Sequence, residues 1–479
     1  MGNAETCRRL STATFPAPGK VMGRISAHHT QEVLDLLQWA GRRKVPLYPI
    51  SGGKNWGYGS CVPPGEEAFV LSLAPMQKIA AYDEEAGVMT LEPGVSFRQV
   101  QQFLAEQGSA WQLNGPGSTP DASVVGNLLS RGMVQGPNLE HWKRVIAMEV
   151  ALPNGELIRT DDHASLSTYR SVGMGPDVLP LFFQSNLGVV TKVQIQLSRR
   201  PNCWQHLHLC WEEAALTVEE VGKVVRNLRL QEIFRANVSI HNAEKIHTFV
   251  GQYPWHLTMG KTPLPKKVSR EMSMEIGGGD WYLETAISGA NGAILSAKKA
   301  AIEQAFADFS LQLVWGRENA EGPIFHRFTR TETRQMYWRK RTAAPAEAKP
   351  EMDGCGIIWF APVIPWRTPE IQKCRNLLEQ IASKYAFEPM LTFQIPNANY
   401  AYAVISLLYD RAEPGEDTRA MQAYAELQKA FAKLGCTTYR KALHHHFIPH
   451  SASNLLQHIK QYTDPANILS PGYYLPSTS

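Results

Sequence analysis

The stretch Tyr48–Ser60, YPISGGKNWGYGS, decides how the rest of this sequence is interpreted. It overlaps the end of Val45–Ile50, a short run typical of a β-strand, and then places four glycines among small polar residues. Glycine lets the backbone approach a ligand closely, and successive N–H groups in such a loop form a concave anion site. The loop matches neither the G-x-x-x-x-G-K-[ST] nor the G-x-G-x-x-G pattern. It therefore indicates either a pyrophosphate site of another type or a plain surface turn.

A second segment of the same character favours the first of these readings. Asn114–Gly132, NGPGSTPDASVVGNLLSRG, is again rich in small polar residues and leads into a predicted helix. Leu91–Gly94, LEPG, lies between the two segments. Two glycine-rich loops in one α/β stretch predict a large diphosphate-containing cofactor spread over one domain.

The flanking sequence alternates between helix and strand patterns. Thr30–Lys44 has apolar residues at helical spacing, as does Ser96–Gln107. Asn154-Gly155 suits a tight turn, which predicts a β-hairpin from the two runs on either side of it. The predicted strands are Gly87–Pro93, Val145–Leu152, Glu156–Thr160 and Gly188–Leu197.

The pattern changes near Arg199–Asn202. Residues 205–435 combine strand-like alternation (WQHLHLCW, YAYAVISLLY) with long helical patterns (SAKKAAIEQAFADF, QAYAELQKAFAKL), and the last forty residues resemble the first part again. We therefore predict an α+β protein in which residues 1–204 and 436–479 form one domain and residues 205–435 form a second, inserted one.

Composition excludes several classes of protein. The 479 residues are 44% hydrophobic and 19% charged, so the chain is neither disordered nor fibrous. A net charge of +4 without a basic run argues against nucleic-acid binding, and no apolar stretch approaches the ~18 residues of a membrane span. Seven scattered cysteines without a CxxC pair, and no apolar signal core, suggest a reduced, cytoplasmic setting. Gly2 and Thr6 match the loose M-G-x-x-x-[ST] myristoylation pattern, which occurs often by chance.

A set of ordered motifs resembles the FAD-binding domain shared by vanillyl-alcohol oxidase and the p-cresol methylhydroxylase flavoprotein. The resemblance covers residues 30–200 and about 350–475, and it implies a two-domain FAD-binding fold with an inserted cap, or substrate, domain. The motifs are PISGGKNWGYGS, LEPGVSF, SVVGNLLSRG, ALPNGELIRT, FFQSNLGVVTKVQIQL and DPANILSPG.

The resemblance implies FAD as the cofactor and a set of residues that bind it. The first loop would wrap the pyrophosphate, the second would line the isoalloxazine and ribityl parts, and a third pair would approach from the next strand. These residues are Pro49, Ile50, Ser51, Gly52, Gly53, Lys54 and Asn55; Pro116, Gly117, Ser118, Ser123, Val124, Gly126 and Asn127; and Gly188 and Val189.

Three further residues match the substrate site of the branch that oxidises para-alkylphenols: Tyr58, Tyr439 and Arg440. A phenol loses a benzylic hydride most readily as its phenolate. Two tyrosine hydroxyls and a permanently charged guanidinium can bind that oxygen anion and lower the phenol's pKa. Arg440 could also offset the charge of reduced flavin. Taken singly, such residues are more often packing tyrosines and a surface arginine.

The sequence departs from the family pattern at several positions. Ile357, in GCGIIWFAPV, stands where covalent members have a flavin-bonding His or Tyr, and Lys54 stands where other members have a His, so we predict non-covalent FAD. Ser118 replaces an aspartate near flavin N5, and Asp121 could substitute for it only if the loop differs. Ala401 and Tyr402 replace paired histidines, so Ile357 and Tyr402 are predicted to line an altered substrate pocket.

The resulting prediction is an FAD-dependent oxidase or dehydrogenase of a para-substituted phenol or related aromatic, acting through a quinone methide. Two alternatives remain: the same chemistry on a non-phenolic alcohol or biosynthetic intermediate, and a catalytically silent flavin-binding protein. The electron acceptor would be O2 or a protein such as a cytochrome, and the family suggests a homodimer. HHHFIPH, with His444, His445, His446 and His450, matches no standard metal spacing, so no metal is predicted, although one of these histidines could reach the substrate as a base.

Overall fold

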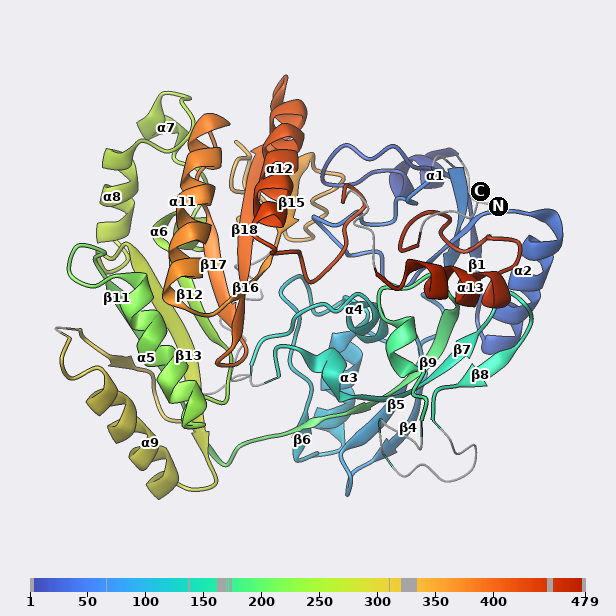
Figure 1. Ribbon diagram of the computed structural model, residues 1–479, viewed down its shortest axis with the longest axis horizontal. Coiled ribbons are helices and arrows are strands. Elements are labelled where there is room, and N and C mark those ends of the chain that lie inside the picture. The colour runs from blue at the N-terminus through green and yellow to red at the C-terminus, as the bar shows by residue number, and fades with distance from the viewer. Residues whose placement is uncertain are drawn as a thin grey trace. The chain divides into compact units, whose positions relative to one another are not determined.

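The computed structural model describes residues 4–65, 67–136, 138–161, 169, 171, 175–309, 311–319, 334–445 and 451–475 (Figure 1). The chain forms two compact units. The first contains Met1–Met133, Glu140–Arg200 and Arg440–Ser479, and the second contains Val134–Leu139 and Pro201–Tyr439. The predicted boundaries after residues 204 and 435 each lie four residues from these limits. Val134–Leu139 is a short excursion into the second unit that no local pattern indicated.

The first unit contains two main sheets. One is a three-stranded parallel sheet in the order β1-β3-β2, and the other is a five-stranded antiparallel sheet in the order β4-β5-β9-β7-β8. The predicted hairpin is present, because Val150 pairs with Ile158 and Gly155 has a φ of 100° in the turn. The strands are β1 Lys20–Ser26, β2 Leu47–Ile50, β3 Glu67–Ser72, β4 Ile79–Asp83, β5 Val88–Leu91, β6 Trp111–Gln112, β7 Val145–Ala151, β8 Leu157–Arg159, β9 Val189–Gln196 and β10 Ser198–Arg199.

The helices of the first unit follow the apolar periodicity of the sequence. In α2 the apolar residues Val33, Leu34 and Leu37 are buried, and the helix ends where Lys44 adopts a left-handed φ of 54°. α3 begins with a capping box between Ser96 and Gln99. The helices are α1 Ala4–Leu10, α2 Thr30–Arg43, α3 Phe97–Glu106, α4 Val124–Leu129, η1 His141–Arg144, η2 Leu179–Phe182 and α13 Ser453–Thr463.

The C-terminal segment returns to the N-terminal sheet. Leu469 bridges to Leu47 of β2 in parallel, and Ile468 and Leu469 are buried in the same core cluster as the inner face of α2. Lys460 of α13 reinforces this return through a buried pair with Asp464 at 2.5 Å. The C-terminus therefore supports the strand that leads directly into the glycine-rich loop.

The second unit is an eight-stranded sheet with a main order of β14-β11-β13-β12-β17-β18-β15, and β16 pairs with β18. Its long strands pair in antiparallel fashion. The strands are β11 Cys203–Trp211, β12 Val238–Asn242, β13 Trp281–Gly289, β14 Val314–Trp315, β15 Cys355–Phe360, β16 Val363–Pro365, β17 Leu391–Ile395 and β18 Tyr400–Asp410.

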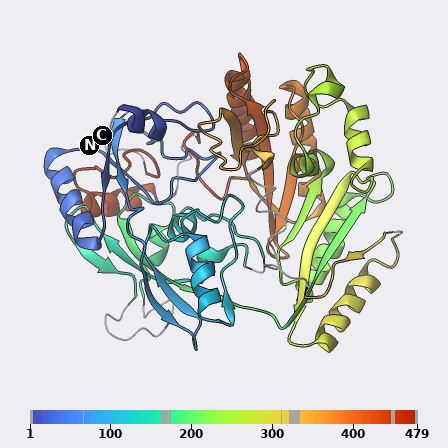
Figure 2. The same ribbon diagram turned by 180° about the vertical axis from the view of Figure 1, so that it is seen from behind.

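The two faces of this sheet differ in chemistry. On one face Phe360 packs edge-on against Tyr424 and Phe431 of α12, and Figure 1 shows α5, α11 and α12 in front of the strands. Figure 2 shows the unit from behind, with the strands towards the viewer. The helices are α5 Val218–Leu230, α6 Ala243–Val250, α7 Trp255–Thr258, α8 Lys266–Met274, α9 Gly292–Ala305, α11 Thr368–Lys384 and α12 Glu416–Lys433.

The other face carries polar side chains in register. Tyr402 of β18 lies opposite Gln394 of β17, which lies opposite Ser239 of β12, and Ser239 lies opposite Glu284 of β13. Ser239 Oγ donates to Gln394 Oε1 at 2.9 Å. Successive side chains of a strand point to opposite faces of the sheet. These polar side chains therefore lie on the face opposite to that of Phe360.

None of the helices formed by the described residues is long and apolar enough to cross a membrane.

Candidate functional site

The two predicted cofactor loops meet in the first unit. A Cβ atom placed on Gly52 would lie 3.3 Å from the backbone nitrogen of Ser123. A Cβ on Gly126 would lie 3.2 Å from Ser51 Oγ. Both glycines thus allow a backbone approach that a larger residue would hinder. Segments 51–53 and 121–126, far apart in the sequence, form one cradle of backbone and small side chains.

Three other predicted cofactor positions, Ser123, Val124 and the pair Gly188 and Val189, have different structural surroundings. Ser123 caps α4 and also donates to the Pro93 carbonyl at 2.6 Å, which ties the second loop to the LEPG segment. Val124 is fully buried. Gly188 has a packing reason for lacking a side chain, because a Cβ there would lie 2.6 Å from Val150 Cγ1. Val189 belongs to the buried core of the unit.

Arg440 is held against the glycine-rich loop. Its guanidinium carbon lies 4.2 Å from the centre of the Tyr58 ring, and its Nη2 donates to Asn55 Oδ1. The Arg440 Nε atom is buried and makes no hydrogen bond with the described residues. The Leu443 N–H donates to the Tyr58 carbonyl at 3.0 Å. This bond keeps the segment after Arg440 beside the glycine-rich loop. The site thus presents a fixed cation stacked on a tyrosine.

Further residues around Arg440 were not predicted from the sequence. Tyr473 and Tyr474 have ring centres 4.2 Å apart, and the Lys441 ammonium lies 5.2 Å from the Tyr473 ring. Burial lowers the pKa of Lys441 to about 8, and burial raises the pKa of Tyr474. The backbone N–H of Lys441 donates to Gln184 Oε1 at 2.7 Å. The sequence signals were the paired tyrosines after SPG and a lysine next to the predicted arginine.

Tyr439, the residue before Arg440, belongs to the second unit. Its ring lies 4.7 Å from that of Tyr402, and its N–H donates to the Ala361 carbonyl at 3.3 Å. Tyr402 is the first residue of the polar row formed by Tyr402, Gln394, Ser239 and Glu284. Ile357 of β15 is fully buried, and its partner in β18 is Leu408, which places it on the same face as Tyr402.

Asp121 is engaged in a surface ion pair. Its two carboxylate oxygens accept hydrogen bonds from Arg98 at 2.6 and 3.1 Å. The bond from Arg98 is the main cause that lowers the pKa of Asp121. A carboxylate that is ionised and already paired is a weak candidate for the base that Ser118 cannot provide.

The histidine cluster is only partly described. The ring of His444 packs edge-on against Phe15 at 4.3 Å, and His445 lies 6.2 Å from His444. His446 and His450 lie outside the described residues, as does Gly2. Within the described ranges, no group of three His, Cys, Asp or Glu residues is arranged to hold a metal ion.

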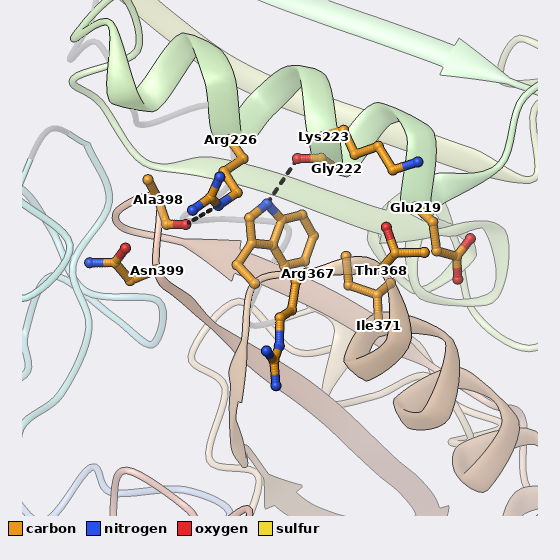
Figure 3. Close-up of a pocket in the computed structure, with 10 residues that line it drawn as sticks. Glu219, Gly222, Lys223, Arg226, Arg367, Thr368, Ile371, Ala398 and Asn399 are labelled. Atoms are coloured by element: carbon orange, nitrogen blue, oxygen red, sulfur yellow. Dashed lines mark hydrogen bonds between the residues drawn. The ribbon is translucent and has the colours of Figure 1, made fainter.

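The second unit also contains a cavity of about 330 Å³ between α5 and the start of α11 (Figure 3). Trp366 lines it, and its Nε1 donates to the Gly222 carbonyl at 3.1 Å. Arg226 also lines it and donates through Nε to the Ala398 carbonyl at 3.1 Å. This cavity contains none of the site residues that the sequence predicted.

The residues of the first unit fit FAD in their chemistry. The cradle of segments 51–53 and 121–126 offers closely approaching backbone, which suits a pyrophosphate. Arg440 supplies a positive charge with a buried, unpaired donor, which suits an electron-rich oxygen or nitrogen. Ser51, Asn55 and Asn127 add neutral polar groups at the same loops.

Comparison with protein families gives the same assignment. The FAD binding domain family matches residues 23–161, and the family described as FAD linked oxidases, C-terminal domain, matches residues 214–474. The second match alone spans more than half of the chain.

Two curated relatives match over almost their whole length. The chain is 35% identical to 1'-carboxy-chondrochloren decarboxylase of Chondromyces crocatus, covering 97% of this chain and 92% of that protein. It is 28% identical to the 4-cresol dehydrogenase [hydroxylating] flavoprotein subunit of Pseudomonas putida, covering 94% and 86%. Several 2-hydroxy-acid dehydrogenases match too, such as a putative mitochondrial D-lactate dehydrogenase of Schizosaccharomyces pombe at 30% identity, but over only 38% of this chain.

Solved structures agree with these relatives. The crystal structure of p-cresol methylhydroxylase with substrate bound superposes with a TM-score of 0.88 at 25% identity, covering 99% of this chain and 93% of that one. A 4-ethylphenol oxidase from Gulosibacter chungangensis has the same fold, with a TM-score of 0.86. The predicted α+β fold, FAD cofactor and oxidoreductase class are confirmed. The chain belongs to the FAD-linked oxidase family and is an FAD-dependent oxidoreductase with the p-cresol methylhydroxylase fold.

Proposed function

We propose that this enzyme oxidises a para-substituted phenol at its benzylic carbon. The observation that carries the proposal is the Arg440 guanidinium, stacked 4.2 Å from the Tyr58 ring and bonded to Asn55, with Nε left unpaired. A fixed cation beside a tyrosine suits a phenolate oxygen. The relatives that match almost the full chain include a protein named for 4-cresol, whereas the hydroxy-acid dehydrogenases match only a part.

The roles of the protein residues follow from their chemistry. Arg440 and the hydroxyls of Tyr58 and Tyr439 bind the phenolate, lower the phenol's pKa and orient the ring. Tyr439 and Arg440 are consecutive, so their Cα atoms are about 3.8 Å apart. In the second unit, Tyr402, which contacts Tyr439, and Ile357 are the residues that would contact the para substituent. When bound in the cradle, FAD would supply the acceptor for the benzylic hydride.

The product depends on the substituent. Loss of hydride converts the phenolate to a quinone methide, an electron-poor species that adds water or loses a proton. Ser118 offers no carboxylate to assist water, and Asp121 is paired with Arg98. Both features reduce base assistance to hydration.

A second candidate outcome is oxidative decarboxylation, favoured by the 35% identity to a decarboxylase. In a substrate with a carboxylate on the carbon next to the benzylic one, the quinone methide can release CO2. The C–C electron pair then forms a vinyl double bond and restores the aromatic phenolate. The two candidates share the hydride step and differ only in the later fate of the quinone methide, which adds water or loses a proton in the first and releases CO2 in the second.

The test is anaerobic mixing of the purified holoenzyme with 4-ethylphenol and, separately, with 3-(4-hydroxyphenyl)propionate, following flavin absorbance. Bleaching by either compound supports phenol oxidation, and the release of CO2 with 4-vinylphenol from the second supports decarboxylation. The matched control is 3-(4-methoxyphenyl)propionate, which cannot form a phenolate.

If only simple 2-hydroxy acids bleach the flavin, the proposal is wrong and a non-phenolic alcohol is the substrate. If no compound bleaches a flavin that dithionite reduces, a silent flavin-binding protein is favoured. Readmission of air then shows whether O2, rather than a cytochrome-like protein, is the acceptor.

We also propose that FAD is bound without a covalent link, because Ile357 has no nucleophilic atom. Precipitation with trichloroacetic acid should release all yellow colour into the supernatant. Colour retained in the washed pellet would contradict this. The proposed homodimer can be checked by light scattering on the same preparation.

A further inference from the structure

His141 and Asn127 form a buried hydrogen bond beside the cofactor cradle. His141 begins η1 and is only 2% exposed, and its Nε2 lies 2.7 Å from Oδ1 of Asn127 in α4. Between these residues the chain passes through Val134–Leu139, which belongs to the second unit, and returns. Their contact is therefore a product of the tertiary structure and not of one local element.

The environment of His141 fixes its tautomer. Burial lowers its pKa to about 3, so the ring is neutral at pH 7 and carries one proton. Its Nδ1 atom is buried and has no hydrogen-bond partner among the described residues. A proton on Nδ1 would leave a buried unpaired donor, at a cost of about 1–3 kcal/mol, whereas a proton on Nε2 is used in the bond. Nε2–H therefore donates to Asn127 Oδ1.

The backbone of Gly132 confines the same amide from another side. A Cβ atom at Gly132 would lie 2.3 Å from Asn127 Nδ2 and 2.5 Å from Cγ. The Gly132 N–H also donates to the Asn127 carbonyl at 2.7 Å. With its oxygen bound to His141 and its plane against Gly132, the amide of Asn127 has one orientation. In the described part of the chain no acceptor takes a hydrogen bond from its Nδ2.

Asn127 directly follows Gly126, whose closest neighbour in the other cofactor loop is Ser51 Oγ. The half-buried amide therefore lies at the cradle with two N–H groups to offer. We propose that His141 is a positioning residue for the cofactor, which orients Asn127 so that its side-chain N–H donates to an oxygen or nitrogen acceptor of FAD. The proposal depends on FAD binding and not on the identity of the substrate.

The test measures FAD affinity without substrate. Apoprotein of each variant is titrated with FAD, and the quenching of flavin fluorescence gives Kd. Asn127→Asp keeps the acceptor for His141 but removes both N–H donors, and we expect Kd to rise at least tenfold. His141→Phe keeps a ring but loses the donor and should raise Kd similarly. His141→Gln retains an N–H donor and should restore Kd to within about threefold of the parent.

The combination of variants separates positioning from packing. If His141 acts through Asn127, the double variant His141→Phe/Asn127→Asp should bind FAD no more weakly than Asn127→Asp alone. Gly132→Ala, which displaces the amide without touching His141, should also weaken binding tenfold and tests the idea if His141→Phe does not fold. The matched control is His247→Phe, a buried neutral histidine of the second unit bonded to Ser273, which should leave Kd unchanged. A parental Kd for Asn127→Asp, or equal losses for His141→Gln and His141→Phe, overturns the proposal.

Discussion

Arg440 makes two contacts that give its charge a fixed position, and one of its nitrogens has no partner among the described residues. Stacking on the Tyr58 ring provides a cation–π interaction, Asn55 accepts from one terminal nitrogen, and Nε remains for a ligand. We propose that a planar guanidinium held in this way keeps its geometry when substrate binds, so that little reorganisation is needed as charge moves in the reaction.

Arg440→Ala should therefore slow flavin reduction by 4-ethylphenol at least tenfold while FAD stays bound. Arg440→Lys should recover only part of the rate, because an ammonium cannot stack and donate in the same way. Stopped-flow absorbance measures the reduction, and the flavin spectrum before mixing reports the bound cofactor. Arg367→Ala, an exposed arginine of the second unit paired with Glu370, is the control and should react like the parent. An unchanged rate for Arg440→Ala would remove Arg440 from the site.

Asp121 provides a second residue-level prediction. Because Arg98 lowers its pKa and occupies both oxygens, we do not expect it to act as a base. Asp121→Asn should change the rate of flavin reduction by less than about threefold and leave its pH profile unshifted. A loss of the acidic limb of that profile would instead identify Asp121 as the base.

Among the elements, α13 is followed by a segment that packs against β2, the strand that leads into the glycine-rich loop. Lys460 Nζ lies 2.5 Å from Asp464 Oδ2, donates to the Asn186 carbonyl at 2.7 Å and to the Leu469 carbonyl at 3.2 Å, and is 3% exposed. Leu469 in turn pairs with β2, which leads into the loop. One ammonium thus joins α13, the segment after it and the segment before β9.

Lys460→Met should destabilise the protein by about 3 kcal/mol, because it leaves the Asp464 carboxylate buried without its counter-ion. Chemical denaturation followed by tryptophan fluorescence measures the loss. The double variant Lys460→Met/Asp464→Asn should regain part of it, since no buried charge remains. Lys433→Met, at an exposed end of α12, should have almost no effect. Equal stability of Lys460→Met and the parent would show that the pair contributes little.

At the scale of the whole molecule, buried histidines link stability to pH. Burial lowers the pKa of His141 and His241 to about 3 and that of His247 to about 4. In the unfolded chain each has a pKa of about 6.5. Between these values the unfolded state binds more protons than the folded state. Stability is therefore fully present above about pH 6.5 and is lost as the pH falls. Glu244 acts in the opposite direction, because burial raises its pKa to about 7.

We accordingly expect the Tm to fall between pH 7 and pH 5, with each histidine contributing at most about 1.4 kcal/mol per pH unit. Thermal unfolding followed by circular dichroism at several pH values measures this slope. His247→Phe should have a shallower slope than the parent, since one proton-binding difference is removed. A variant slope as steep as the parent's would show that carboxylates dominate the acid response.

Several helices and strands of the first unit could be predicted from the sequence, because they depend on local features, whereas FAD and the family followed from the resemblance of the ordered motifs. β1, β3, β4 and α1 were not predicted. Amphipathic periodicity, an Asn-Gly turn and glycine-rich loops act over a few residues, and α2, α3 and the β7–β8 hairpin follow them closely. The change of pattern near residue 200 lies close to Arg200, where the chain leaves the first unit.

Which side chains meet could be learned from the folded structure alone. Arg440 and Asn55 are separated by 385 positions, Lys460 and Asn186 by 274, and His141 and Asn127 by 14 with a passage through the other unit between them. No periodicity specifies such pairs, because each depends on how separate strands and helices pack. Folding removes the Lys460 ammonium and the His141 ring from water and supplies their hydrogen-bond partners. It also brings the two tyrosines beside Lys441.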